Sequence, residues 1–119
     1  MPGGIIVTST DTTINTTITI TNVEYVSSVT NTVMKATITI QYPSKRVFLD
    51  HRSIESIVLD LARSRKWLVE ELAEAIAKYI AELVNTHASR NKNIIYTVRV
   101  RIETQETSSM HVTIETEYP

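Results

Sequence analysis

The stretch VMKATITIQYPSKRVFLDHRSIESIVLDLARS (residues 33–64) changes the spacing of its apolar residues part-way along. Up to Tyr42, apolar and polar residues alternate, which is typical of a strand with one buried face. Pro43 ends this alternation. From Ile54 on, apolar residues recur at i, i+3, i+4 and i+7, the stripe of an amphipathic helix. The stretch therefore predicts a strand followed by a helix.

Two helices are predicted in the middle of the chain. The first begins near Asp50 or Ser53, because either residue can cap a helix N-terminus, and Glu55 suits the positive end of the helix dipole. The second covers residues 66–85. Its apolar stripe consists of Leu68, Leu72, Ile76, Tyr79, Ile80 and Leu83.

Strands are predicted on both sides of these helices. The alternation of residues 18–20 changes parity at Val23 and Tyr25, and a bulge near Asn22 would return all these apolar side chains to one face. Residues 27–32, SSVTNT, are typical of a turn. Residues 94–104 and 110–118 alternate again, after a polar loop.

The element order is therefore ββααββ. Four strands with one apolar face need a cover, and two amphipathic helices supply it, which predicts an α+β two-layer sandwich with a four-stranded antiparallel sheet. Residues 1–13 are expected to form a tail or a loose strand, and residues 14–119 a single domain.

The second sheet face carries Thr, Lys, Arg, Glu and His. It either faces solvent or lines a wet cavity in a larger barrel, and a ring of chains joined edge to edge would also pair the open sheet edges. Arg99 and Arg101 lie on this face. Pairing with Glu115 and Glu117 on the next strand is a simpler role for them than phosphate binding.

Composition excludes several classes of function. The chain has 119 residues, a net charge of −1 and no cysteine. Without a basic excess we expect no nucleic-acid or anionic-membrane partner, and without cysteine there is no disulfide, thiol nucleophile or thiolate-bound zinc. Residues 1–10 lack the features of a signal peptide, and no apolar stretch has the length of a membrane span, so we expect a cytoplasmic protein.

Residues 50–77, DHRSIESIVLDLARSRKWLVEELAEAIA, resemble dihydroneopterin aldolases. LDHR (49–52) stands where that family has V-D-Y-A, and LVEELAEAIA (68–77) where it has L-I-E-T-L-A-E-A-I-A. VRVRIET (98–104) resembles the family strand that ends in V-x-K-P, and ITITNVEYV (18–26) its first strand. The resemblance covers residues 14–118.

The resemblance implies the tunnelling fold (T-fold), in which the sheets of several subunits join into a barrel, here a tetramer or octamer. It implies a pterin or purine-like ligand at the subunit interface and neither cofactor nor metal. The family glutamate that accepts hydrogen bonds from the pterin 2-amino group and ring N–H is Glu70 in this chain. Helix periodicity alone does not separate Glu70 from Glu71 or Glu74.

Other candidate binding residues are Asp50, Thr104 and Trp67. Asp50 and Thr104 stand at the family's aspartate and lysine positions, and Trp67 either packs at the helix start or stacks on a flat ring. The family tyrosine is His51 here, and Thr104 is followed by Gln105 instead of proline. Aldol cleavage needs a proton shuttle, and His51 is the candidate acid/base because imidazole titrates near neutral pH. Otherwise His51 is a surface residue.

Three functions remain open. The first is pterin or purine-like ring binding, with a possible metal-independent lyase or epimerase activity. The second is a non-catalytic binding or scaffold oligomer, which the missing lysine and tyrosine favour. The third is a cyclohydrolase-like metal enzyme, although His51, His87 and His111 are scattered and only His111 is expected to approach Glu103 or Glu106. An unrelated ββααββ sandwich would be a monomer.

Overall fold

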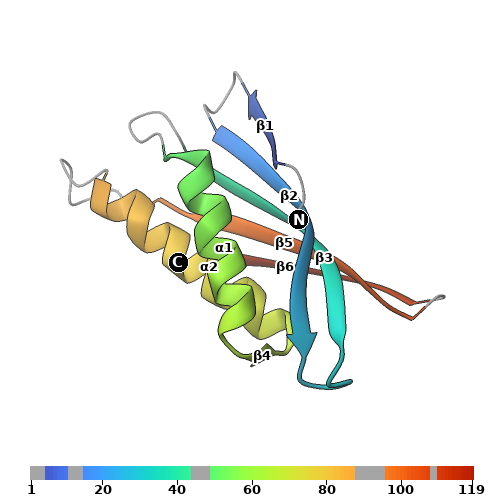
Figure 1. The fold of residues 1–119 in the computed structure, drawn as a ribbon. Coiled ribbons are helices and arrows are strands. Elements are labelled where there is room, and N and C mark those ends of the chain that lie inside the picture. The colour runs from blue at the N-terminus through green and yellow to red at the C-terminus, as the bar shows by residue number, and fades with distance from the viewer. Residues whose placement is uncertain (1–4, 11–14, 44–48, 88–95, 108–109) are drawn as a thin grey trace.

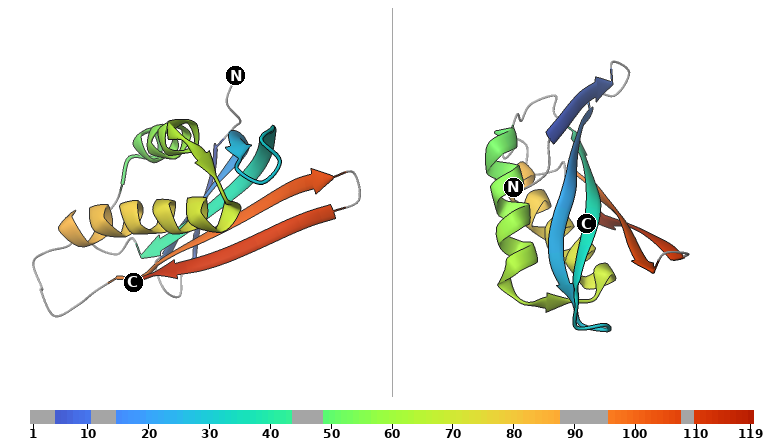
Figure 2. Two further views of the ribbon diagram at one scale, coloured as in Figure 1. Left: turned by 90° about the horizontal axis from the view of Figure 1, so that it is seen from below. Right: turned by 45° about the vertical axis from the view of Figure 1, so that its right-hand side comes forward.

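Two helices lie on one face of a single twisted sheet (Figure 1). The computed structural model describes residues 5–10, 15–43, 49–87, 96–107 and 110–119. The elements are β1 (Ile5–Thr10), β2 (Asn15–Ser27), β3 (Val33–Pro43), α1 (His51–Ser64), β4 (Lys66–Trp67), α2 (Val69–His87), β5 (Val98–Thr107) and β6 (Met110–Tyr118). The helix α1 packs on β2, and α2 packs on β5 and β6. The other sheet face has no helix of the described residues on it (Figure 2).

The α+β class is confirmed, but the prediction of a four-stranded antiparallel sheet is wrong. The strand order is β1-β2-β3-β5-β6, with all neighbours antiparallel, and β4 pairs in parallel with the end of β2. The strand β1 pairs with residues 15–20 of β2. Two residues are too few to show a periodicity, so the connection between the helices could not be predicted as a strand.

The predicted bulge in β2 is confirmed. The register with β3 shifts between Ile20 and Val23, and Asn22 has a φ of 56°. Asparagine tolerates this left-handed conformation better than other residues with a side chain. The bulge brings both halves of the strand to the same side, where Ile18, Ile20, Val23 and Tyr25 are all buried. The predicted turn follows, and the Ser27 N–H donates to the Thr32 carbonyl at 3.0 Å.

The helix starts differ in part from the prediction. Asp50 is the N-cap of α1, and its carboxylate accepts hydrogen bonds from the Arg52 N–H at 3.4 Å and the Ser53 hydroxyl at 2.9 Å. The first turn of α1 has no acidic residue, so the role predicted for Glu55 is wrong. The helix α2 begins at Val69 instead of residue 66 because Lys66–Trp67 pair with β2.

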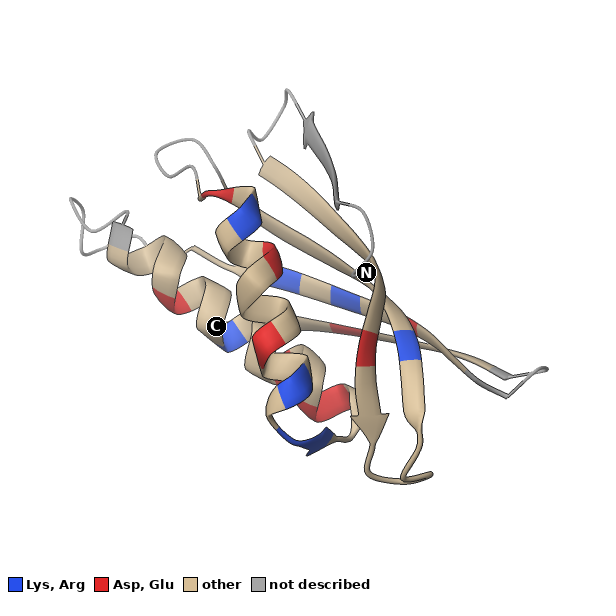
Figure 3. Cartoon of the chain, in the orientation of Figure 1, with Lys and Arg blue, Asp and Glu red and all other residues tan. Residues whose placement is uncertain are grey.

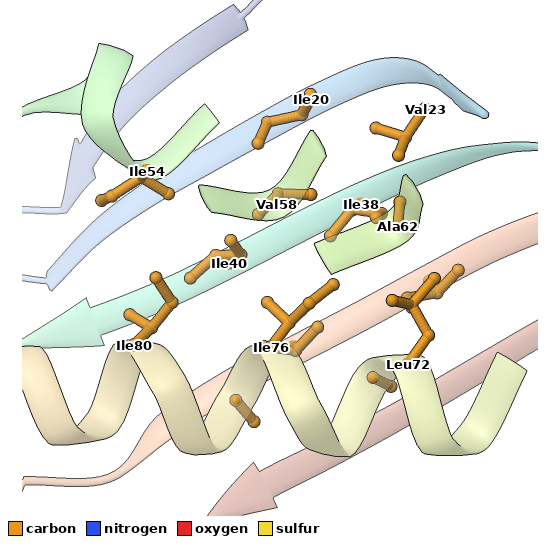
Figure 4. Close-up of a cluster of buried hydrophobic side chains, with 14 of the residues drawn as sticks. Ile20, Val23, Ile38, Ile40, Ile54, Val58, Ala62, Leu72, Ile76 and Ile80 are labelled. Carbon is orange, nitrogen blue, oxygen red and sulfur yellow. The ribbon is translucent and has the colours of Figure 1, made fainter. Parts of the chain in front are cut away.

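The buried face of α2 is rotated relative to the predicted stripe. Leu68 and Tyr79 are 38% and 45% exposed, whereas Ala73, Ala77 and Ala81 are buried. These alanines, four residues apart, lie on one side of the helix, and Tyr79 lies on the exposed side. Figure 4 shows side chains of both helices and of the sheet in this core. Its labelled residues are Ile20, Val23, Ile38, Ile40, Ile54, Val58, Ala62, Leu72, Ile76 and Ile80.

Asn85 joins the end of α2 to the chain that enters β5. Its side-chain amide donates to the carbonyls of Ala81 at 2.9 Å and Tyr96 at 3.1 Å, and its Oδ1 accepts from the Tyr96 N–H at 2.8 Å. We expect Asn85→Ala to lower the free energy of unfolding by about 1–3 kcal/mol, because these half-buried backbone groups lose their partner. Urea denaturation measures the change. Thr86→Ala, at an exposed neighbouring position, should change it by less than about 0.5 kcal/mol. Equal effects of the two substitutions would contradict this role.

Candidate functional site

The structure distinguishes the two glutamates in the first turn of α2. Glu70 and Glu71 are both exposed. Glu71 pairs with Arg65, with 3.5 Å between Oε2 and Nη2, whereas Glu70 forms no ion pair with a residue that the structure describes. Figure 3 shows basic colouring at and just before β4, close to this acidic turn. Glu70 is thus a carboxylate at the positive end of a helix, where a negative charge is favoured, and no described Lys or Arg forms an ion pair with it.

Trp67 lies beside this turn as a core residue. Its side chain is 5% exposed, and its indole N–H donates to the Leu61 carbonyl at 2.8 Å. The guanidinium of Arg65 lies over the ring, with its central carbon 3.7 Å from the ring centroid. A flat ligand would have to displace Arg65 to stack on this face of Trp67.

Sequence reasoning missed Arg65, which contacts both Trp67 and Glu71. The two-residue separation of Arg65 and Trp67 could have indicated their contact. Arg65 and Trp67 are two residues apart around a short extended segment, and such residues lie on the same side of the backbone. Their alternation covers too few residues to have been recognised as a strand.

A hollow of about 550 Å³ lies between this region and the end of β6. Arg65, Trp67 and Glu71 contribute to its wall, as do Lys78, Thr116 and Tyr118. Glu70 does not line it. The hollow is therefore a feature of the outer side of α2 and β6, separate from the Glu70 carboxylate.

Asp50 and His51 lie at the far end of α1 from Glu70. The 14 residues of α1 span about 21 Å, and it is the C-terminal end of this helix that leads into β4 and α2. The Asp50 carboxylate is engaged in capping, and His51 is half-buried. One chain therefore does not bring Asp50 and His51 together with Glu70.

Thr104 is buried on the helix-facing side of β5, at 3% exposure. Its hydroxyl donates to the Lys35 carbonyl at 3.2 Å. It also contributes to the wall of a hollow of about 220 Å³, together with Lys35, Glu103 and His111. His111 and Glu103, which were expected to approach each other, line the same hollow, and no ion pair joins them. The side chains of His87 and Glu106 lie outside the described residues.

The uncovered sheet face carries ion pairs between neighbouring side chains. Arg99 pairs with Glu117 at 2.6 Å and with Glu115 at 3.5 Å, which confirms its predicted cross-strand role. The hydrogen bond that the Arg99 guanidinium donates to the Glu117 carboxylate is the main cause that raises the pKa of Arg99 above its usual value. Arg101 pairs instead with Glu103 of its own strand, at 3.4 Å, so its predicted cross-strand pairing is wrong. Within the described ranges, no three His, Asp or Glu side chains gather as a metal site.

Comparison with models of protein families, with curated proteins and with solved structures found no match. Among the helices of the described residues, none combines the length and the apolar character needed to cross a membrane.

Proposed function

We propose that the chain is an oligomeric binding protein for a pterin or purine-like ring, with a T-fold and with Glu70 as the anchor of the ring. The observation that carries the proposal is the exposed Glu70 carboxylate at the start of a 19-residue helix, with no ion pair to a described residue. The order of the elements, with two helices on one sheet face, is consistent with it.

The two oxygens of the Glu70 carboxylate determine which groups of a ring it would bind. A carboxylate accepts two parallel hydrogen bonds from two adjacent N–H groups, such as an exocyclic amino group and the neighbouring ring N–H. Hydrogen bonds to a charged group contribute about 1.5–3 kcal/mol each. A 2-amino-4-oxo ring should therefore bind more tightly than an analogue without the 2-amino group.

The ligand site would lie between subunits. Within one chain, about 21 Å of α1 separates His51 from the start of α2. A proton transfer by His51 to or from a ring held at Glu70 therefore needs His51 from another subunit. This is the arrangement in which the metal-independent lyase or epimerase activity would operate.

The threonine at position 104 favours a protein that binds the ring without catalysing a reaction. It stands where the dihydroneopterin aldolases that the sequence resembles carry lysine, and it is buried with its hydroxyl donating to the Lys35 carbonyl. It therefore offers no ammonium group for proton transfer. A binding oligomer that has lost the chemistry is the second candidate function.

We expect neopterin, dihydroneopterin or guanine to stabilise the wild-type chain in a thermal-shift titration. A ligand that binds only the folded state adds about 2.7 kcal/mol at a hundredfold excess over Kd. Glu70→Ala should abolish the shift because the ring N–H groups lose their acceptor. Glu71→Ala is the matched control, since this neighbour already pairs with Arg65, and it should retain the shift.

The outcomes separate the alternatives. The same shift in wild type and in Glu70→Ala would contradict the role of Glu70, and no shift with any of the three ligands would contradict ring binding. If binding is found, release of glycolaldehyde from dihydroneopterin distinguishes the lyase from the binding protein. Loss of that release in His51→Ala, with binding retained, would assign the proton transfer to His51.

A further inference from the structure

The strand β6 forms an edge of the sheet, and no other described strand pairs with its outer side. At the opposite end of the sheet, β1 is also an edge strand, and β1 and β4 pair with parts of β2. Open edges are usually protected by proline, by bulges or by charges that point inward. The nine residues of β6 contain no proline, and their charged side chains lie on the uncovered sheet face.

The apolar row of the core continues onto this edge. Ile102 of β5 is fully buried, whereas its neighbour Ile114 in β6 is only half-buried. Val112 is also half-buried, and Tyr118 is 38% exposed. The side of β6 that faces the helices therefore presents apolar surface at the point where a further strand would cover it.

We propose that β6 pairs antiparallel with β6 of a second copy of this chain, about a two-fold axis at Ile114. In this register residue 110 lies opposite residue 118 of the second copy, so all nine residues of the strand are paired. Residues directly opposite each other point to the same face. The helices of both copies then cover the same side of one continuous sheet.

The strand is complementary to itself in this register. On the uncovered face, His111 lies opposite Glu117 of the second copy, and Thr113 lies opposite Glu115. On the helix-facing side, Ile114 meets its own copy. No two carboxylates face each other, and each histidine gains an acidic neighbour.

Other symmetric registers are worse. An axis at Glu115 would place two carboxylates directly opposite each other, which is destabilising. An axis at Thr113 would pair residues 110–116 with each other, two residues of β6 fewer than the axis at Ile114. The axis at Ile114 alone combines full length with opposite charges.

The hollow of about 550 Å³ supports the same contact. Thr116 and Tyr118 form part of its wall, together with Glu71 and Lys78 on the outer side of α2. In the proposed pair, Val112 of the second copy lies opposite Thr116. The apolar side chain of Val112 of the second copy would therefore lie at the mouth of this hollow, between α2 and the end of β6.

The pairing is independent of the proposed ligand, since it uses β6 and not Glu70. The contact is also isologous, so it closes after two copies, whereas a ring built head to tail would pair β6 with the other sheet edge. A larger oligomer would need a second contact elsewhere on the chain.

The absence of cysteine from the sequence allows a direct test by single substitutions. Opposite residues of an antiparallel pair have Cα atoms about 4.5–5.5 Å apart, within the range of a disulfide. Ile114→Cys should therefore form a covalent dimer on mild oxidation, seen on a non-reducing gel. Val112→Cys and Thr116→Cys should each fail, because their copies lie about 14 Å apart along the strands. The double variant with both substitutions should cross-link through 112 and 116.

Light scattering on the wild-type chain completes the test, with a dimer or a multiple of two copies as the expected result. A monomer overturns the proposal, and so does an oligomer in which the cysteine at 114 does not cross-link while the chain remains folded by circular dichroism. Cross-linking of Val112→Cys or Thr116→Cys as efficient as that of Ile114→Cys also overturns it.

A surface substitution keeps the test independent of folding. His111 is exposed, so His111→Glu should leave the fold intact while placing carboxylates opposite Glu117 at two points of the interface. We expect it to weaken the dimer at least tenfold, measured by sedimentation equilibrium. His111→Lys places an ammonium group opposite Glu117 of the second copy and should retain the dimer. Equal dimerisation of these two variants would overturn the proposed register.

Discussion

A chain that lacks Asn22 is expected to lose the folded structure. In the bulge, Thr21 and Asn22 together stand against one residue of β3, and in a strand one residue shorter the side chains of Val23 and Tyr25 would turn to the uncovered sheet face. Both are buried, at 0% and 2% exposure. Burying a side chain of this size contributes about 1.5–3 kcal/mol, so the deletion removes about 3–6 kcal/mol. A whole domain is stable by only about 5–15 kcal/mol.

Thermal unfolding followed by circular dichroism measures this effect. Asn22→Gly is the matched control, because glycine adopts a positive φ without cost and keeps the bulge. It should fold with nearly unchanged stability. Asn22→Val should lie between the two, since a β-branched residue is strained at a φ of 56°. A deletion variant as stable as wild type would show that the strand does not need the extra residue.

Ile76→Ala is expected to lower the free energy of unfolding by about 2–5 kcal/mol. Ile76 is fully buried on the side of α2 that faces the sheet. Removing its side chain leaves a cavity that the neighbouring side chains fill only in part. The midpoint of urea unfolding should fall while the slope with denaturant stays the same.

Tyr79→Ala provides the comparison that tests the rotation of α2. The apolar stripe of the sequence includes Tyr79 beside Ile76, but the structure leaves Tyr79 45% exposed. Its substitution should therefore cost less than about 1 kcal/mol. Equal losses for Ile76→Ala and Tyr79→Ala would mean that the helix buries the face that the sequence stripe indicated.

Prediction from the sequence was most accurate where the local pattern of residues allowed only one or two structures. The alternation of β2 breaks at a single point, and only a bulge keeps both apolar halves on one face, so Asn22 could be identified in advance. Asp50 was one of two possible caps for the same reason. The stripe of α2 was less accurate, because both alanines and large residues follow the helical period and their burial depends on how closely the helix approaches the sheet.

The candidate site shows the same division. Carboxylates in the first turn of α2 follow from the sequence, and a resemblance singled out Glu70. The ion pair of Glu71 with Arg65 is a contact across the turn between two elements, and only the structure separates these neighbouring glutamates. The distance between His51 and Glu70 likewise depends on the direction in which α1 runs. The pattern of residues along the helix does not predict this direction.

The sequence by itself determined the class of the fold, the order of its main strands and helices, and the side of each main strand that is buried, because these follow from the period of apolar residues along the chain. The tertiary structure alone decided that β1 and β6 are the edge strands, that the connection between the helices pairs with β2, and which face of α2 is buried. These features depend on contacts between segments far apart in the chain, where the energy of packing outweighs local preference.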